Sequence, residues 1–467
     1  MLKLVPALAA LITAPALAQP LTPAEASQID QLVTHTLQKT GVPSASIAVV
    51  RDGRIVLAKA YGKANEGLPA TAALPYQIAS NSKQFTAMAL LLLEDEGKLS
   101  LDDHVDKYLP GISGGDRIAL RQLLTHTSGI QDFWPQDYSF EAMSHPTAPQ
   151  GIVDKWAKKP LDFAPGDQWQ YSNTGYVVAG MIAEKVSGEP LVAYLTRKIF
   201  KPLGMTSVRD QDDTNGPTFP AGYGRYALGP LRPVASPARG WLYAAGELSM
   251  SAADLAKWDI ARIDRALVPV DDWAAQETPV KLNDGSDTGY GLGVGVRTVN
   301  GRQLIRHTGE AVGFLSINDV FPKDRVAVVV LTNSWNTGSA YTQIARDIEK
   351  VVLPAAPGAA SDATVTAQAA RARATLDQLR AGKLDRSQLT QNANFYFTAQ
   401  AITDFQASLA PLGEPTAFEP QGKPVLRGGF VIQGYTIKYP GRSLDLSTFY
   451  EPGANGRIEQ YLISPGE

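Results

Sequence analysis

Two side chains three residues apart, Ser80 and Lys83, form the pair in this chain that is best suited to covalent catalysis. They lie between an extended run, residues 74–79, and an apolar run, residues 85–93, so they are predicted to open a buried helix. Side chains at this spacing on a helix face the same way. The field of a helix N-terminus favours a serine alkoxide and disfavours a charged lysine. The pair indicates a serine nucleophile, although a serine N-cap followed by a surface lysine has the same pattern.

A candidate partner for the serine is Tyr171. It is the first residue of the one Tyr-x-Asn sequence in the chain, and Asn173 is the last. Both lie in the loop before the predicted helix 175–186. A phenol can accept the serine proton if a nearby cation lowers its pKa, and Lys83 is such a cation. The alternative is a buried tyrosine beside an asparagine cap.

A third motif, His307, Thr308 and Gly309, follows a short predicted strand at residues 304–306. A glycine there lets the strand edge lie close to a bound acyl group, while the next amide points at the acyl oxygen. The Lys-Thr-Gly sequence at residues 39–41 is similar, but it lies at a helix end, where lysine and glycine have ordinary capping roles.

The elements that must position these residues alternate between sheet and helix patterns. A helix at 22–38 is followed by strands 46–50 and 55–61 around an Asp-Gly turn. Helices joined by Pro/Gly/Asp-rich loops occupy about residues 83–255. Strand patterns then return, and a helix closes the region; these elements are 291–299, 304–306, 315–321, 326–331 and 341–352. We predict an α/β domain over residues 22–353, an antiparallel sheet flanked by helices with a large inserted helical subdomain.

A second domain is expected after this one. Residues 354–363 have the Pro, Ala, Gly and Ser content of a linker. Residues 364–467 are predicted to be α+β, with helices first and strands last, at 365–381, 399–409, 430–439, 444–450 and 458–463. This region weakly resembles an NTF2-like module, without a diagnostic motif, and we expect it to have a packing or substrate-restricting role.

Composition excludes several classes of function. The 467 residues have a net charge of -3 and no basic cluster, so nucleic acid is not an expected partner. There is no cysteine, and the five histidines lack metal-binding spacing, so no metal is expected. A glycine-rich phosphate loop is also missing, so no cofactor is expected.

The first 18 residues have the pattern of a signal peptide. Lys3 precedes an apolar run at 4–17, and Ala16-Leu17-Ala18 forms a small-x-small cleavage signal. No later stretch is long and apolar enough to span a membrane. We therefore expect a secreted or periplasmic protein without a membrane span.

The order of the three motifs resembles the penicillin-recognising serine hydrolases of the class C β-lactamase type. That family includes serine D,D-carboxypeptidases, D-aminopeptidases and related esterases. The resemblance covers roughly residues 22–353 and includes supporting stretches at 123–129, 163–166, 201–205 and 245–246. It implies a β-lactamase/transpeptidase-like fold.

The resemblance also implies roles for the first two motifs. Ser80 would be the acylated nucleophile, and Lys83 its proton partner and electrostatic activator. Tyr171 would be the general base and acid, and Asn173 would orient the lysine and the substrate amide. His126 is expected to be structural rather than catalytic.

In the third motif, His307 takes the place of a lysine that faces the substrate carboxylate in the lactamases. Thr308 and Gly309 would line the strand beside the acyl group, and the backbone N–H groups of Ser80 and Glu310 would form the oxyanion hole. Histidine here is the form of some peptidases of the family. Glu310 either places a carboxylate near the pocket or points to solvent. Our hypothesis is a weak β-lactamase that prefers an amine-bearing or neutral ester or amide.

The predicted function is that of an exported serine hydrolase that acts through an acyl-enzyme on amide or ester bonds. Its substrate would be a small molecule or peptide, with peptidoglycan fragments, D-amino acid peptides, esters and lactams all open. A rival nucleophile lies in the Gly-x-Ser-x-Gly sequence at 111–115, but no buried strand pattern precedes it. A second rival is a catalytically silent penicillin-binding sensor or interaction protein, against which the intact Ser, Lys, Tyr and Asn argue.

Overall fold

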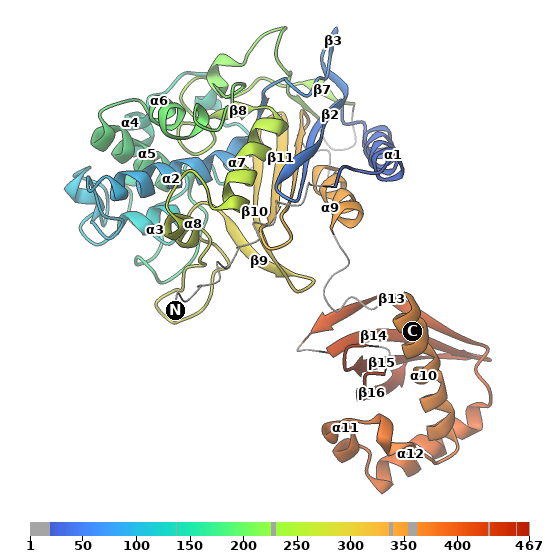
Figure 1. Ribbon diagram of the computed structural model, residues 1–467. Coiled ribbons are helices and arrows are strands. Elements are labelled where there is room, and N and C mark those ends of the chain that lie inside the picture. The colour runs from blue at the N-terminus through green and yellow to red at the C-terminus, as the bar shows by residue number, and fades with distance from the viewer. Residues whose placement is uncertain are drawn as a thin grey trace, which may run out of the picture. The chain divides into compact units, whose positions relative to one another are not determined.

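The computed structural model describes residues 19–136, 138–225, 230–335, 340–353, 362–427, 430–453 and 455–466. The expected signal peptide, residues 1–18, and residues 354–361 of the expected linker lie outside these ranges. The chain divides into two compact units, with the main boundary between Leu353 and Pro354 (Figure 1). Within the described ranges, no helix has the length and apolar character needed to cross a membrane.

The first unit is built on a seven-stranded sheet with the order β3-β2-β1-β12-β11-β10-β9. The predicted hairpin around Asp52 and Gly53 forms β1 and β2, and β1 also pairs antiparallel with β12. Segments from the two ends of the unit therefore complete one sheet. The bounds are β1 (Ser44–Arg51), β2 (Arg54–Asn65), β3 (Leu68–Pro69), β9 (Gly295–Val299), β10 (Arg302–Ala311), β11 (Phe314–Phe321) and β12 (Val326–Thr332).

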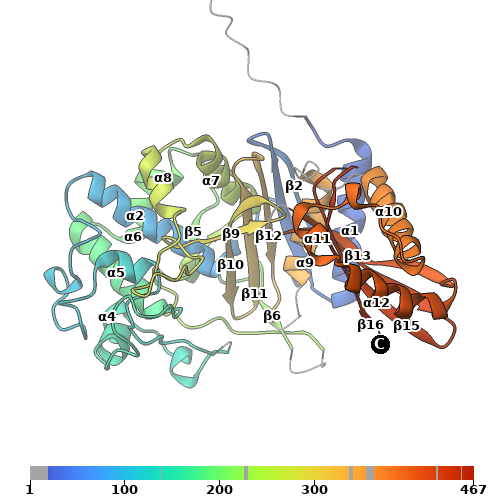
Figure 2. The same ribbon diagram turned by 90° about the horizontal axis from the view of Figure 1, so that it is seen from below.

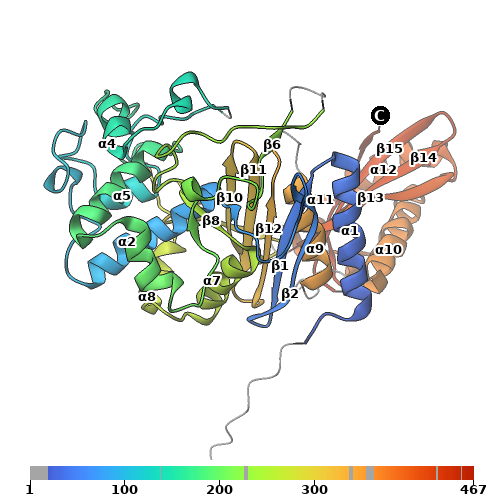
Figure 3. The ribbon, with the colours of Figure 1, turned by 90° about the horizontal axis from the view of Figure 1, so that it is seen from above.

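Two helices cover one face of this sheet, α1 (Pro23–Thr40) and α9 (Ala340–Val352) (Figure 3). Helix α1 begins with a capping box between Thr22 and Glu25 and ends at Gly41, whose φ of 77° suits glycine. Its apolar side packs with strand and α9 residues in a continuous core that includes Ile29, Val33, Ile47, Val328 and Ile344. The expected helix at 22–38 is confirmed.

The helical insertion covers the opposite face (Figure 2). At its centre is α2, which is buried on nearly every side, as its continuous apolar sequence requires. The helices of this layer are α2 (Lys83–Asp95), α3 (Leu120–Leu124), α4 (Pro149–Ile152), α5 (Asn173–Ser187), α6 (Leu191–Leu195), α7 (Ala252–Asp264) and α8 (Val270–Gln276). Small sheets complete it, formed by β4 (Tyr76–Gln77), β8 (Leu248–Met250) and β5 (Arg209–Asp210), and by β6 (Tyr223–Gly224) and β7 (Arg232–Pro233).

Two predicted extended segments need correction. The run 74–79 is a strand only over β4, because Ala79 already begins a 3-10 turn, η1 (Ala79–Ser82). The strand predicted at 304–306 is too short: β10 continues to Ala311, and Thr308 pairs with Ile317 of β11. The Thr-Gly sequence predicts the end of a strand. Pairing with β11 instead extends β10 through His307, Thr308 and Gly309.

The second unit is α+β, as predicted. Its helices are α10 (Asp362–Arg380), α11 (Gln391–Tyr396) and α12 (Ala399–Leu409). Its antiparallel sheet has the order β13-β14-β15-β16, with bounds Ala417–Arg427, Phe430–Tyr439, Arg442–Tyr450 and Ile458–Pro465. The sequence did not predict α11 or β13. The latter contains two prolines and a glycine, which an edge strand tolerates and a strand pattern hides.

Candidate active site

Ser80 lies in the tight turn η1 that leads directly into α2. The residue before it, Ala79, has a φ of 48°, a left-handed conformation that is strained for a residue with a Cβ. The hydroxyl of Ser316 on β11 holds this turn, since it donates to Ile78 O at 2.8 Å and accepts from Asn81 Nδ2 at 2.9 Å. The sheet therefore fixes the turn that carries the serine.

Lys83, the first residue of α2, is fully buried and surrounded by oxygen atoms. Its Nζ lies 3.0 Å from Ser80 Oγ, 2.8 Å from Asn173 Oδ1 and 2.7 Å from Ala245 O. Burial lowers the pKa of Lys83 to about 7, while the negative charge of Asp132 acts in the opposite direction. Near neutral pH a large fraction of this lysine is therefore an uncharged amine.

Tyr171 is hydrogen-bonded through its side chain to Ser80, and its ring centroid lies 4.8 Å from Lys83 Nζ. Burial, the largest effect, raises the pKa of Tyr171 above its usual value, and the charge of Asp132 raises it further. The expectation of a lowered pKa is wrong, because burial of the phenol outweighs the hydrogen bond with Ser80, which acts to lower it. At neutral pH Tyr171 is a protonated phenol.

Asn173 begins α5, after the N-cap Ser172, whose hydroxyl accepts from Gly175 N. The backbone N of Asn173 donates to Asp132 Oδ1 at 3.0 Å, and Asn173 Nδ2 donates to Asp132 Oδ2 at 3.3 Å. Sequence reasoning missed Asp132. No spacing rule connects it to Asn173, and only its position just after the stretch 123–129 could have drawn attention to it.

The third oxygen around Lys83 comes from the backbone, and sequence reasoning missed it as well. Ala245 O belongs to a tight turn in which Ala244 has a φ of 54°. Thr86 of α2 fixes this turn by donating from Oγ1 to Ala244 O at 2.7 Å. A backbone acceptor leaves no signal in side-chain types, so this role required the structure.

His307 lies on β10, and its Nε2 is 2.8 Å from the hydroxyl of Tyr290. Burial, and next the charge of Lys83, lower the pKa of His307 to about 3. The imidazole is therefore neutral and provides no positive charge for a substrate carboxylate.

Gly309 permits the closest approach between β10 and the turn that carries Ser80. A Cβ at this position would lie 2.0 Å from Ile78 O and 2.2 Å from Ser316 Oγ. The glycine is thus required for packing against that turn. The approach of a bound acyl group, the reason expected from the sequence, stays a prediction.

These residues surround a cavity of about 440 Å³. Its wall includes Ser80, Tyr171, Asn173, His307, Thr308 and Glu310, together with Asp132. Glu310 is an exposed residue of the cavity lining, and Trp335 Nε1 donates to its Oε1 at 2.7 Å. No lysine or arginine is found among the described residues that line the cavity. The lining includes two acidic residues, Asp132 and Glu310, and a neutral histidine.

Two further predictions concern residues beside this cavity. Ser80 and Glu310 both line it, and the oxyanion hole formed by their N–H groups stays a prediction. His126 is buried, accepts from Ser172 N at its Nδ1 at 3.1 Å, and its ring centroid lies 4.2 Å from that of Tyr171. These contacts hold the loop that carries the tyrosine.

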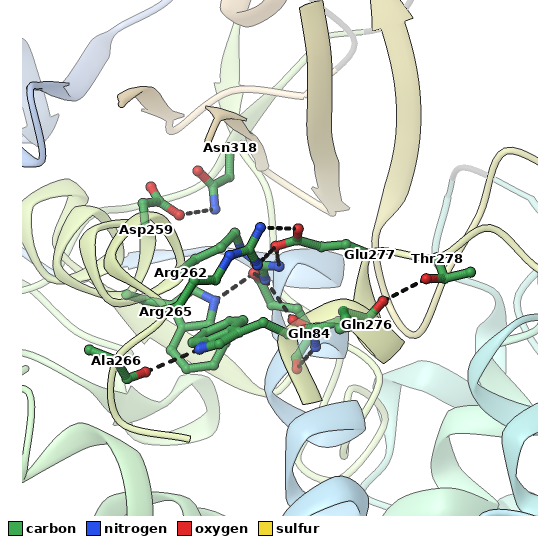
Figure 4. A network of polar contacts seen from close by, with 12 residues as sticks. Gln84, Asp259, Arg262, Arg265, Ala266, Gln276, Glu277, Thr278 and Asn318 are labelled. Atoms are coloured by element: carbon green, nitrogen blue, oxygen red, sulfur yellow. Dashed lines mark hydrogen bonds and ion pairs between the residues drawn. The ribbon is translucent and has the colours of Figure 1, made fainter. Parts of the chain in front are cut away.

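A buried polar network contacts the start of α2 through Gln84 (Figure 4). Arg262 of α7 donates to Gln84 Oε1 at 3.0 Å, to Gln276 Oε1 at 2.7 Å and to Glu277 Oε1 at 3.0 Å. Trp258 Nε1 also donates to Gln84 Oε1 at 2.6 Å. Because Gln84 follows Lys83, this network fixes the turn of helix that carries the lysine.

The rival serine lies in a different setting. Residues 111–117 are turns that follow η2 (Val105–Lys107), and Ser113 N donates to Ala157 O at 3.0 Å. The strand that a nucleophile elbow needs does not precede it in this described stretch.

Comparison with known proteins gives consistent results. The family model described as Beta-lactamase matches residues 29–353. Protein flp of Staphylococcus aureus (strain N315) is 31% identical over 321 residues, which are 66% of this chain and 62% of that protein. The putative penicillin-binding protein PbpX of Bacillus subtilis (strain 168) is 31% identical over 316 residues, 66% of this chain and 74% of that protein. The match thus spans less than two thirds of the length of the first relative.

Solved structures have the same fold. A D-stereospecific amidohydrolase from Streptomyces sp. is 27% identical with a TM-score of 0.59, and the match covers 71% of this chain and 98% of that one. The octameric penicillin-binding protein homologue from Pyrococcus abyssi, 23% identical, has a TM-score of 0.60 over 94% of this chain and 100% of that one. These matches confirm the resemblance and the fold class predicted from the sequence.

Proposed function

The chain belongs to the beta-lactamase family, and we propose that it is a serine hydrolase in which Ser80 forms an acyl-enzyme with an amide or ester substrate. The observation that carries this proposal is the setting of Lys83. Its Nζ lies 3.0 Å from Ser80 Oγ, and its pKa is lowered to about 7. A buried amine that is partly uncharged at neutral pH can take the serine proton.

The reaction follows from these contacts. Neutral Lys83 accepts the proton of Ser80, and Ser80 Oγ forms an ester bond with the substrate acyl carbon. The bond from that carbon to the leaving nitrogen or oxygen breaks, and the Tyr171 phenol protonates the leaving group. The phenol regains a proton from the Lys83 ammonium. Water then hydrolyses the ester with the same groups, which restores Ser80.

The wall of the cavity supports a substrate that is neutral or carries an amine. Glu310 and Asp132 are acidic residues of the cavity lining, and His307 is neutral. Like charges repel a substrate carboxylate, whereas an ammonium group is attracted. The named activity of the similar Streptomyces protein, a D-stereospecific amidohydrolase, agrees with an amide substrate. We propose that the enzyme hydrolyses D-amino acid amides, peptides and esters faster than it hydrolyses β-lactams.

This preference is tested by comparing kcat/KM for a carboxylated β-lactam with that for a neutral aryl ester and a D-amino acid amide. Faster lactam hydrolysis would contradict it. Glu310→Gln should raise the relative rate with the anionic lactam about tenfold or less, since one wall charge is removed in a partly hydrated site. The matched control is Glu141→Gln, at an exposed glutamate outside the cavity wall.

The second candidate is a penicillin-binding sensor without turnover. The observation that favours it is the similarity to PbpX, a putative penicillin-binding protein. A stable adduct that never hydrolyses would favour the sensor, whereas steady turnover would favour the hydrolase.

The proposal includes export and a two-domain organisation. We propose that residues 1–18 are a cleaved signal peptide, that residues 22–353 form the hydrolase domain, and that 354–363 link it to the domain at 364–467. Sequencing the N-terminus of protein from a periplasmic extract tests the first point. The role of the domain at 364–467 is tested by deleting residues 354–467 and measuring turnover and solubility. Activity should survive the deletion if that domain only packs or restricts substrates.

A further inference from the structure

Asp132, which no motif singled out, is tied to the first turn of α5 through several contacts. Its Oδ1 accepts from Asn173 N at 3.0 Å and from Trp134 N at 3.2 Å. The neighbouring Phe133 N donates to Thr174 Oγ1 at 2.9 Å. These bonds pin the loop of Asp132 against α5 and direct the second carboxylate oxygen, Oδ2, at the side chain of Asn173.

That second oxygen determines which way the amide of Asn173 faces. Burial raises the pKa of Asp132, while its hydrogen bonds from Trp134 N and Asn173 N and the charge of Lys83 act to lower it and favour the carboxylate. A carboxylate only accepts hydrogen bonds, so the atom of Asn173 that lies 3.3 Å from Asp132 Oδ2 is the donor Nδ2. The amide oxygen Oδ1 is thereby turned toward Lys83, whose Nζ lies 2.8 Å away. Without the carboxylate, an amide turned by 180° would bring Nδ2 to the lysine instead.

The orientation of the amide decides where the lysine lone pair points. An uncharged amine has two N–H groups and one lone pair. Asn173 Oδ1 and Ala245 O accept only, so they take the two N–H groups, and the lone pair faces the remaining neighbour, Ser80 Oγ. If Nδ2 faced the amine, it would compete with the serine hydroxyl for that lone pair.

We propose that Asp132 is a positioning residue that, through the amide of Asn173, aims the lone pair of Lys83 at the hydroxyl of Ser80. The inference rests on the proposed function, since it concerns the same proton transfer. Asp132 also supplies a negative charge that favours the ammonium form of Lys83, so its removal alters both the geometry and the titration of the lysine.

The test uses the full chain with Asp132→Asn, Asp132→Ser, Asn173→Ala and the double variant Asp132→Asn/Asn173→Ala. The matched control is Asp162→Asn, at an exposed aspartate outside the cavity wall. The substrate is 4-nitrophenyl acetate, which carries no amine, so a role of Asp132 in binding a substrate ammonium does not contribute. Melting temperatures confirm that each variant is folded.

We expect Asp132→Asn and Asp132→Ser to lower kcat about 10- to 100-fold with little change in KM, the size of loss that a misplaced catalytic group causes. The acidic limb of the pH profile should move to lower pH, because the charge that favours the ammonium is gone. The double variant should be no slower than Asn173→Ala alone. Unchanged kcat and pH limb in the Asp132 variants, or losses that multiply in the double variant, would overturn the proposal.

A readout without turnover separates this inference from the proposed function. In Ser80→Ala protein, NMR titration of the Lys83 side chain should give a lower pKa when Asp132→Asn is added and an unchanged one with Asp162→Asn. An unchanged Lys83 titration in the Asp132 variant would overturn the inference even if the protein proves to be a hydrolase. Absence of any reaction at Ser80 in the unmodified protein would instead contradict the proposed function.

Discussion

Lys83 Nζ and Ser80 Oγ lie 3.0 Å apart, and the two other directions around the amine are taken by Asn173 Oδ1 and Ala245 O. The lysine is fully buried, so the arrangement favours the uncharged amine over the ammonium. The serine hydroxyl therefore faces a base within the same turn of chain.

The first prediction concerns the pH dependence of acylation. Below its pKa of about 7 Lys83 is an ammonium and cannot accept the serine proton, so the acylation rate should rise with pH through that value and then level off. His307, whose pKa is about 3, cannot cause this limb. Stopped-flow acylation with a neutral aryl ester between pH 5 and 9 measures it. A rate that is flat or falls across pH 7 would contradict the role of the lysine.

A second prediction concerns stability. The folded-state pKa of Lys83 lies below the ordinary lysine value of 10.5, so the unfolded chain binds more protons between about pH 7 and 10.5, and stability rises with pH there. Lys83→Met removes the cost of burying this amine. This variant should have a higher free energy of unfolding and no acylation. The gain in stability should be larger at pH 6 than at pH 9, by an amount on the order of 2 kcal/mol. Urea unfolding at the two pH values checks this, and an equal gain at both would count against it.

Gly309→Ala is the third test. The new methyl group would meet Ile78 O at 2.0 Å, and backbone cannot move aside cheaply, so either β10 or the turn before Ser80 must shift. We expect a loss of about 1–3 kcal/mol in stability and a large fall in acylation. Thr308→Ala, at the neighbouring residue that lines the cavity, should leave the melting temperature nearly unchanged. Equal melting temperatures for the two variants would show that the close contact is unimportant.

The fourth prediction concerns the network in Figure 4. Arg262→Met removes the donor to Gln276 Oε1, one of the two donors to Gln84 Oε1 and one of the two partners of Glu277. Breaking a buried ion pair of this kind costs about 3–5 kcal/mol. Arg265→Met is the matched control: this partly exposed arginine also pairs with Glu277, and its loss should cost about 1 kcal/mol or less. Chemical denaturation of the two variants measures the difference.

Much of the fold could be predicted because its signals are local. The Asp-Gly hairpin, the cap at Gly41 and the apolar run of α2 each depend on a few neighbouring residues, and the structure contains all three elements. The length of β10 and the presence of β13 could not be predicted, because pairing with another strand decides both. The Thr-Gly sequence in β10 and the prolines in β13 are local signals against a strand.

The candidate site divides in the same way. Ser80, Lys83, Tyr171 and Asn173 have distinctive types and spacing, and the structure brings them together. Asp132 is a common residue type with no fixed spacing to the motifs. Residues 245–246 support the family resemblance, but the contact with Lys83 is made by a backbone carbonyl, and side-chain types do not show such a role. The raised pKa of Tyr171 is also a consequence of burial, which the sequence does not give.

The most direct test of the account is intact-mass detection of acylation, with the unmodified protein and Ser80→Ala, using penicillins, D-Ala-D-Ala peptides, D-amino acid amides and aryl esters. We predict a covalent adduct of acyl-group mass in the unmodified protein, located at Ser80 by peptide mapping, that decays with time, and no adduct in Ser80→Ala. An adduct that persists in Ser80→Ala, or no adduct with any of these reagents in a protein that is folded, would contradict it.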